Sequence, residues 1–198
     1  VAFGLGPFPA ATLLRAGLAR MRSEMQGICI RVEINNWQRL LEMLLKEEVD
    51  FFISAVSEDM SGHPEIQISP LARQRVGLYV RNGHPLVDQL TTLNDVWTYG
   101  VGAPKLTPNV ARFLQGFLRL PSGTTLELAV QCDDIETLHS LALNTDTVIL
   151  TTDLAVRRLR HDPELRELMI DGLPVTMSST GLVTLNSRQL SPSTNRAI

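Results

Sequence analysis

The side chains that could act as catalysts or metal ligands are few and scattered in this chain of 198 residues. The histidines lie far apart, and no pair has the spacing of a zinc site; they are His63, His84, His139 and His161. Cys29 and Cys132 are too few for a disulfide scaffold or a thiolate zinc site, which favours a reducing cytoplasm. No Gly-x-Ser-x-Gly, phosphate-binding loop or dinucleotide-binding glycine pattern is present. We expect no enzyme, no metal site and no cofactor.

Other residues have the types needed to bind a small molecule. Gly6-Pro7-Phe8 opens a predicted helix whose free N–H groups favour an anion. The alternative is a plain strand-to-helix turn with Pro9 at the first helical position. Lys105, one of two lysines, could neutralise a carboxylate or could be an ordinary solvated side chain. These residues predict a small organic effector, anionic in charge.

Two further clusters follow predicted strands. Trp37 could stack on a planar ligand, but we favour the alternative that it packs its helix on the sheet. Asn35 and Asn36 offer donors and acceptors, and one of them is expected to cap that helix. In the second half of the chain the equivalent residues are Gln131, Cys132 and Asp133, with Asp133 or Asp134 as helix cap and a ligand contact as the alternative.

The elements that carry these residues alternate between strand and helix twice. Apolar spacing predicts strands at 1–5, 28–34 and 49–56, with helices at 10–25 and after Asn36. A shift of 96 residues places Phe3-Gly4-Leu5-Gly6 on Tyr99-Gly100-Val101-Gly102, and the strand 49–56 on 145–152. Residues 28–34 and 126–131 alternate apolar and polar side chains, which indicates sheet edges. We therefore predict two α/β lobes built alike.

Strands at 76–80 and 181–185 are expected to carry the chain between the lobes. Lobe I would comprise residues 1–75 and 176–198, and lobe II residues 76–175. Two crossings form a hinge with a cleft, and ligands of open α/β sheets bind at the carboxyl ends of strands. The predicted cleft residues are Gly6, Pro7, Phe8, Asn35, Asn36, Trp37, Ser54, Gly102, Ala103, Lys105, Gln131, Cys132, Asp133 and Thr151.

Composition excludes several classes of protein. Hydrophobic residues make up 44% of the chain and charged residues 20%, as in folded globular proteins. The net charge of -3 gives no general attraction to nucleic acid or anionic lipid. No apolar run reaches the roughly 18 residues that span a bilayer, so we expect no membrane partner. Both ends interrupt a predicted element, and we expect a piece of a longer protein.

Three segments resemble the effector-binding domain of LysR-type transcriptional regulators. They are Leu45 to Ile53, with Val49-Asp50 before Ile53; Val80 to Leu86, ending in His84-Pro85-Leu86; and Arg188-Gln189-Leu190-Ser191-Pro192. The resemblance covers essentially the whole chain. It implies a periplasmic-binding-protein-like fold of type 2, with two Rossmann-like lobes and a two-crossing hinge.

The resemblance also implies a function. Such a domain senses a small molecule in bacterial cytoplasm, and the effector changes oligomer geometry and DNA binding by a winged helix-turn-helix domain, which this chain lacks. DNA would be a partner only through that domain. The rival interpretation is a solute-binding protein of a transport system with the same fold.

This sequence departs from the family pattern at three places. Asn144-Thr145-Asp146 stands where members usually have Gly-x-Gly, and Asn144 is expected to supply a left-handed backbone. Thr151-Thr152 stands where Pro is usual after the central strand of lobe II. Trp37 replaces a small Ser or Thr.

The predicted edge strands and the helix 10–25 also predict assembly. Exposed edges and apolar helix faces are usually covered, and the family implies an antiparallel side-by-side homodimer, with a tetramer for the full-length protein. The expected interface is isologous. Its predicted residues are Leu14, Ala16, Leu18, Arg31 and Leu138.

Overall fold

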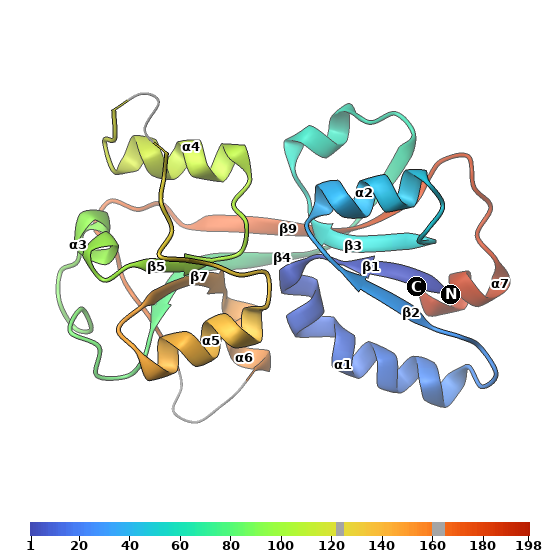
Figure 1. Ribbon diagram of the computed structural model, residues 1–198, viewed down its shortest axis with the longest axis horizontal. Coiled ribbons are helices and arrows are strands. Elements are labelled where there is room, and N and C mark those ends of the chain that lie inside the picture. The colour runs from blue at the N-terminus through green and yellow to red at the C-terminus, as the bar shows by residue number, and fades with distance from the viewer. Residues whose placement is uncertain (122–124, 160–164) are drawn as a thin grey trace. The chain divides into compact units, whose positions relative to one another are not determined.

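The computed structural model describes residues 1–121, 125–159 and 165–198. Arg160, the last residue of a helix expected at 153–160, lies outside the described residues, and so does His161. The chain falls into two compact units, namely unit 1 (Val1–Gln74 and Ser178–Ile198) and unit 2 (Arg75–Met177). It passes between them within β4 (Ile66–Val80) and near the start of β9 (Thr176–Leu185), as Figure 1 shows.

Unit 1 begins with the predicted order of strand, helix, strand, helix and strand. Its elements are β1 (Ala2–Leu5), α1 (Pro7–Glu24), β2 (Arg31–Ile34), α2 (Trp37–Leu45) and β3 (Phe51–Ala55). β1 lies between β2 and β3 and is parallel to both, while β9 pairs with β3 in the antiparallel sense. A 3₁₀ turn (Glu58–Gly62) leads to β4, and α7 (Pro192–Ala197) ends the chain.

The two faces of the unit 1 sheet carry separate cores, because side chains alternate along each strand. Leu40 and Leu44 of α2 pack with Phe52 on one face. Phe3 and Phe51 stack on the other, with ring centroids 5.3 Å apart, in the cluster that α1 covers. Figure 1 shows α1 and α2 beside these strands.

A glycine in β1 sets how closely α2 approaches. A Cβ built on Gly4 would lie 2.5 Å from Leu40 Cδ2 and 3.0 Å from Phe52 Cβ. Any side chain at Gly4 would therefore push α2 away from the sheet.

Unit 2 repeats the same strand order with different helices around it. It contains α3 (Leu93–Thr98), β5 (Val101–Ala103), α4 (Pro108–Phe117), β6 (Val130–Gln131), α5 (Ile135–Asn144), β7 (Val148–Thr152), α6 (Asp153–Arg158) and β8 (Arg166–Glu167). β5 lies between β6 and β7 and is parallel to both, while β4 pairs with β7 and β8 in the antiparallel sense. The corresponding order in unit 1 is β2-β1-β3.

Several expected boundaries are corrected. The helix expected at 10–25 begins at Pro7, and the strands expected at 28–34 and 126–131 span only Arg31–Ile34 and Val130–Gln131. Both stand at sheet edges, as predicted. The strand expected at 76–80 is the last third of β4, which is 15 residues long.

The expected left-handed backbone at Asn144 is wrong. The described non-glycine residues with positive φ are Glu47, Asp88 and Arg119. Asn144 is instead the last residue of α5, and Thr145 after it is extended. The side chain of Thr145 donates to Leu141 O at 2.8 Å, so a hydroxyl ends this helix without the backbone conformation that glycine favours.

Candidate ligand-binding site

Three predicted loops of unit 1 lie next to one another at the carboxyl edge of the parallel strands. Leu5 is in register with Ile34 of β2 and with Ile53 of β3. Gly6 N donates to Ile53 O at 2.8 Å, and Asn35 N donates to Leu5 O at 3.1 Å. The segments that begin at Gly6, Asn35 and Ser54 are therefore neighbours.

The start of α1 offers few donors to an anion. Pro7 and Pro9 have no backbone N–H, and Ala10 N is bonded to Gly6 O at 2.9 Å. Gly6 makes no side-chain cap. Phe8 therefore carries the one N–H group among the first three residues of this helix, and the first turn is a weaker anion site than an ordinary helix N-terminus.

The start of α2 is capped as predicted, and Trp37 packs behind the cap. Asn36 Oδ1 accepts from Arg39 N at 3.0 Å. Trp37 is half-buried and packs against the α2–β3 core, which includes Leu40 and Phe52. Its indole Nε1 is buried without a hydrogen-bond partner. The ring therefore has the packing role, while its N–H remains an unsatisfied donor.

Two polar residues on strands of unit 1 are buried. Ser54 is 3% exposed, and its hydroxyl donates to Ala55 O at 3.1 Å. Gln74, the last residue of unit 1 in β4, is 6% exposed, and its Oε1 has no hydrogen-bond partner. Sequence reasoning missed Gln74, since a glutamine between Arg73 and Arg75 has the pattern of an exposed strand.

In unit 2 the predicted residues after β5 and β6 bind each other. Cys132 N donates to Ala103 O at 3.0 Å, and Asp133 Oδ1 accepts from Lys105 N at 3.0 Å. Gly102 and Ala103 are buried, whereas the side chains of Lys105 and Gln131 are exposed. The carboxylate of Asp133 thus fixes the loop from which Lys105 extends into solvent.

The two helices that follow these strands are capped by their own side chains. Thr107 Oγ1 accepts from Val110 N at 3.4 Å, and Pro108 begins α4. Asp134, rather than Asp133, caps α5 by accepting from Glu136 N at 3.2 Å. The α5 N-terminus therefore already carries an acidic cap.

The end of β7 is polar and fully buried. Thr151 is 0% exposed, and its Oγ1 lies 3.4 Å from Nε2 of His139, which is itself 4% exposed. Thr152 Oγ1 accepts from Ala155 N at 3.2 Å and starts α6. This cap gives a structural role to one of the two threonines that replace the usual proline.

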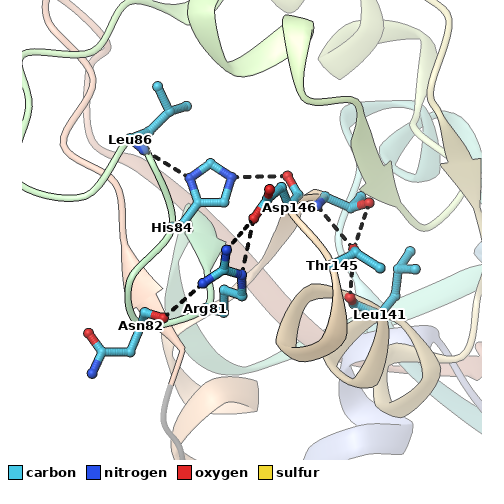
Figure 2. Close-up of polar contacts among 8 residues, drawn as sticks. Arg81, Asn82, His84, Leu86, Leu141, Thr145 and Asp146 are labelled. Atoms are coloured by element: carbon cyan, nitrogen blue, oxygen red, sulfur yellow. Dashed lines mark hydrogen bonds and ion pairs between the residues drawn. The ribbon is translucent and has the colours of Figure 1, made fainter.

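The opposite end of unit 2 is tied together by an ion pair and an imidazole (Figure 2). Arg81 donates to Asp146 Oδ1 through Nε at 3.0 Å and through a terminal nitrogen at 2.6 Å. Leu86 N donates to His84 Nδ1 at 3.0 Å, so the ring proton is on Nε2, which lies 3.0 Å from Asp146 O. Asp146 stands where family members usually have glycine. Here it is bonded to Arg81 and His84, which follow β4.

A second charged cluster begins at Arg75, the first residue of unit 2. Its guanidinium pairs with Glu167, and its backbone N donates to Asp153 Oδ1 at 3.1 Å. Burial raises the pKa of Tyr79, while the nearby Arg75 opposes that rise. In α3, hydrogen bonds from the hydroxyl and backbone N–H of Thr92 lower the pKa of Asp95.

The predicted assembly residues differ in exposure. Ala16 and Arg31 are exposed, while Leu14 and Leu18 pack partly against the α1 core. Leu138 is 0% exposed within unit 2. A surface formed by α1 and β2 thus exists, whereas Leu138 is a core residue.

Neither metal ligands nor a spanning helix come together in the part of the chain that the structure describes. No three His, Cys, Asp or Glu side chains there are grouped to hold a metal ion. No described helix is long and apolar enough to cross a bilayer. A shallow pocket of about 210 Å³ lies by the C-terminal end of α4, away from the predicted site residues, and its lining includes Phe117, Arg119 and Asp171.

Comparisons with known proteins agree on one family. The family profile described as the LysR substrate binding domain matches residues 1–198. The SDS degradation transcriptional activation protein of Pseudomonas sp. (strain ATCC 19151) is 26% identical over 193 residues. That match covers 96% of this chain and 61% of the relative, so the chain spans less than two thirds of that protein.

Solved structures show the same fold. The regulatory domain of MexT, a transcriptional activator in Pseudomonas aeruginosa, has a TM-score of 0.72 at 18% identity, with 99% of this chain and 94% of that one covered. A variant of the OxyR2 regulatory domain from Vibrio vulnificus has a TM-score of 0.71 at 14% identity, with 100% and 91% covered. HinK, a LysR family regulator from Pseudomonas aeruginosa, has a TM-score of 0.68 at 19% identity, with 100% and 66% covered.

The resemblance of Leu45–Ile53, Val80–Leu86 and Arg188–Pro192 is thus confirmed along the full length of the chain, and so is the predicted periplasmic-binding-protein-like fold of type 2. The family is one of transcriptional regulators rather than enzymes. This chain belongs to the LysR substrate-binding domain family, the effector-sensing part of bacterial transcriptional regulators.

Proposed function

We propose that strand-end loops bind the effector, and each unit has its own set of them. In unit 1 these begin at Gly6, Asn35 and Ser54, and in unit 2 they follow β5, β6 and β7. The observation that carries the proposal is the set of hydrogen bonds that brings the three unit 1 loops together at the carboxyl ends of parallel strands. Ligands of open α/β sheets bind at such ends.

The effector of this proposal is a small organic anion. Supporting donors are the N–H of Phe8, the unpaired Nε1 of Trp37 and the exposed ammonium of Lys105. The related regulator is named for SDS degradation, and SDS is itself an organic anion with an alkyl chain. Short alkyl sulfates therefore belong among the compounds to be tested.

The proposed regulator acts as an oligomer in the cytoplasm, and DNA is contacted by a domain outside this chain. The homodimer is formed by α1 and β2, with Ala16 and Arg31 on the exposed side, and the full-length protein forms a tetramer. If the effector binds one arrangement of the oligomer more favourably than the other by about 1–3 kcal/mol, the allosteric coupling has its usual size. Ala16→Arg should then yield monomers in light scattering. Ala19, three residues farther along α1, is also exposed, and Ala19→Arg tests how far the interface extends.

The effector is tested by thermal unfolding of the 198-residue chain with a set of small carboxylates, their amides and hexyl sulfate. A compound at about 100 times its Kd adds about 2.7 kcal/mol, which raises Tm by roughly 5–10 °C for a chain of this size. The anionic class is correct if carboxylates or the sulfate give the rise and their amides do not. The binding function is contradicted if no compound in a broad set raises Tm by more than about 1 °C.

The two lysines provide a matched pair for the site itself. Lys105→Ala removes the charge beside the proposed site, and we expect the affinity for the anion to fall about tenfold, or 1.4 kcal/mol. Lys46→Ala removes the other exposed lysine, which follows α2, and should leave affinity unchanged. Equal effects of the two substitutions would show that Lys105 acts only through the net charge.

A further inference from the structure

Gln74 is a buried polar side chain with an unsatisfied acceptor. The residue is 6% exposed, and its Oε1 has no hydrogen-bond partner. Buried polar atoms in folded proteins are bonded in the great majority of cases, and those that are not call for an explanation. Trp37 Nε1 is the other unpartnered buried side-chain atom found among the described residues.

Strand pairing places Gln74 just past the carboxyl end of β7, one of the strand ends of the proposed site. Asn186 N, just after β9, donates to Glu65 O at 2.8 Å, and a Cβ on Gly181 would lie 3.4 Å from Ser69 O. β4 therefore runs antiparallel to β9, and β9 is antiparallel to β3. It follows that β4 and β3 run in the same direction. Ser54 pairs with Gly181, which lies beside Ser69, so Gln74 is five residues farther along β4 than the level of Ser54. Val76, two residues after Gln74, is in register with Thr152, the last residue of β7.

The residue next to Gln74 is held in place, but Gln74 Oε1 itself has no hydrogen-bond partner. Arg75 is fixed by Asp153 and Glu167, so the backbone on one side of Gln74 is held. An amide oxygen in such a position needs an N–H or O–H donor, and a carboxylate has none to give. A resident water molecule is the competing partner.

We propose that Gln74 Oε1 is a specificity-determining acceptor that recognises an N–H or O–H group of the effector. This inference rests on the proposed function. It narrows the effector to compounds that carry a hydrogen-bond donor as well as an anionic or acceptor group. Hydroxy acids and amide-bearing acids have this combination, whereas simple carboxylates lack the donor.

The first test needs no effector. Gln74→Met keeps the size of the side chain and removes the unsatisfied amide, so Tm of the ligand-free chain should rise by about 2–4 °C. Gln67→Met, on the same strand but exposed, is the matched control and should change Tm by less than about 1 °C. A fall in Tm for Gln74→Met would show that the amide is already bonded and would overturn the proposal.

The second test uses acetamide and acetate as probes, followed by NMR of the ¹⁵N-labelled chain. The side-chain amide signals of Gln74 are identified by their loss in Gln74→Met. Acetamide, which donates, should shift these signals in a saturable way, and acetate should not. No shift with either probe means that water is the permanent partner, and a larger shift with acetate means that the acceptor assignment is wrong; both overturn the proposal.

The two proposals fail separately. If no compound stabilises the chain in the broad thermal screen but acetamide shifts the Gln74 signals, the donor-binding site stands without the effector function. If anions stabilise wild type and Gln74→Met equally, with or without a hydroxyl or amide group, the effector function stands and Gln74 has no part in specificity.

Discussion

Units 1 and 2 share a strand order but differ in the hydrogen bonding of the polar groups named here. In unit 1 the buried Trp37 Nε1 and Gln74 Oε1 have no partner, and α1 begins without a side-chain cap. In unit 2 Asp133, Asp134, Thr107 and Thr152 are all engaged in holding loops or starting helices. Bound groups stabilise a loop, while unbound groups are available to a ligand. The unpaired groups of unit 1 are the ones that our proposal assigns to the effector, together with Lys105 of unit 2.

The largest effect that tests this contrast is expected at His84. The ring is 2% exposed, accepts from Leu86 N, bonds Asp146 O and lies 4.8 Å from the ring of Tyr99. His84→Ala should lower the free energy of unfolding by about 3–5 kcal/mol, because it removes a packed ring and leaves two backbone groups unpaired. Chemical denaturation measures the loss.

His63→Ala is the control for this change. His63 side-chain exposure is 39%, and its removal should change the free energy of unfolding by less than about 0.5 kcal/mol. If His84→Ala costs less than about 1 kcal/mol, unit 2 does not depend on its side-chain hydrogen bonds and the contrast with unit 1 is lost.

Two glycines, Gly6 after β1 and Gly102 within β5, give an intermediate effect. A Cβ on Gly6 would meet Ser54 Cβ at 3.0 Å and Ser54 Cα at 3.3 Å, both close to the rigid backbone. A Cβ on Gly102 would meet the methyl groups of Leu138 and Ile149 at 3.3 and 3.4 Å. Gly6→Ala should cost about 1–3 kcal/mol through overpacking, and Gly102→Ala less, since side chains can move. Equal costs would mean that the backbone at Ser54 yields as readily as the side chains of Leu138 and Ile149.

The two tryptophans test the unpaired donor directly. Trp97 Nε1 in unit 2 donates to Glu127 O at 3.2 Å, whereas Trp37 Nε1 has no partner. Each Trp→Phe change removes a similar part of the ring, but only Trp97→Phe breaks a hydrogen bond. Trp97→Phe should therefore cost about 1 kcal/mol more than Trp37→Phe, measured in urea. A larger loss at Trp37 would indicate a bound partner for its indole N–H.

The smallest effect is a pH dependence confined to unit 2. Hydrogen bonds from Thr92 lower the pKa of Asp95 from its ordinary value of 3.8. A carboxyl with a lowered pKa in the folded chain contributes stability above pH 3.8, and this contribution is lost as the pH falls through the folded pKa. Asp95→Asn should slightly flatten the acid end of the curve of unfolding free energy against pH. Identical curves for wild type and Asp95→Asn would remove this contribution.

Apolar periodicity was enough to predict the elements that bury side chains. The alternation in 28–34 and the continuous apolar run 49–56 gave an edge strand and a strand beside the sheet centre, both confirmed. The predicted strands are longer than the observed ones, because apolar residues can pack against the core without pairing with a neighbouring strand. Ile28 and Ile30 do so before β2 begins. The caps at Asn36 and Thr107 were predictable because their hydrogen bonds are local.

The features that sequence reasoning missed are all non-local. Gln74 is 6% exposed, and nothing in Arg73-Gln74-Arg75 indicates this burial. Likewise the bond between Arg81 and Asp146 joins residues 65 positions apart. Leu138 was predicted at the dimer interface because the helix 134–144 was expected to face the partner chain, but periodicity alone does not say which side of this helix faces its own sheet.

The continuity of β4 across both units has a mechanical consequence. Gln74 is the last residue of unit 1, and Arg75, its covalent neighbour, is anchored to unit 2 by Asp153 and Glu167. An extended backbone is already near its maximum length of about 3.3–3.6 Å per residue, so it has no slack. Gln74 and Arg75 are joined directly in this strand, so a displacement of Gln74 along β4 must move Arg75 or strain its bonds to Asp153 and Glu167.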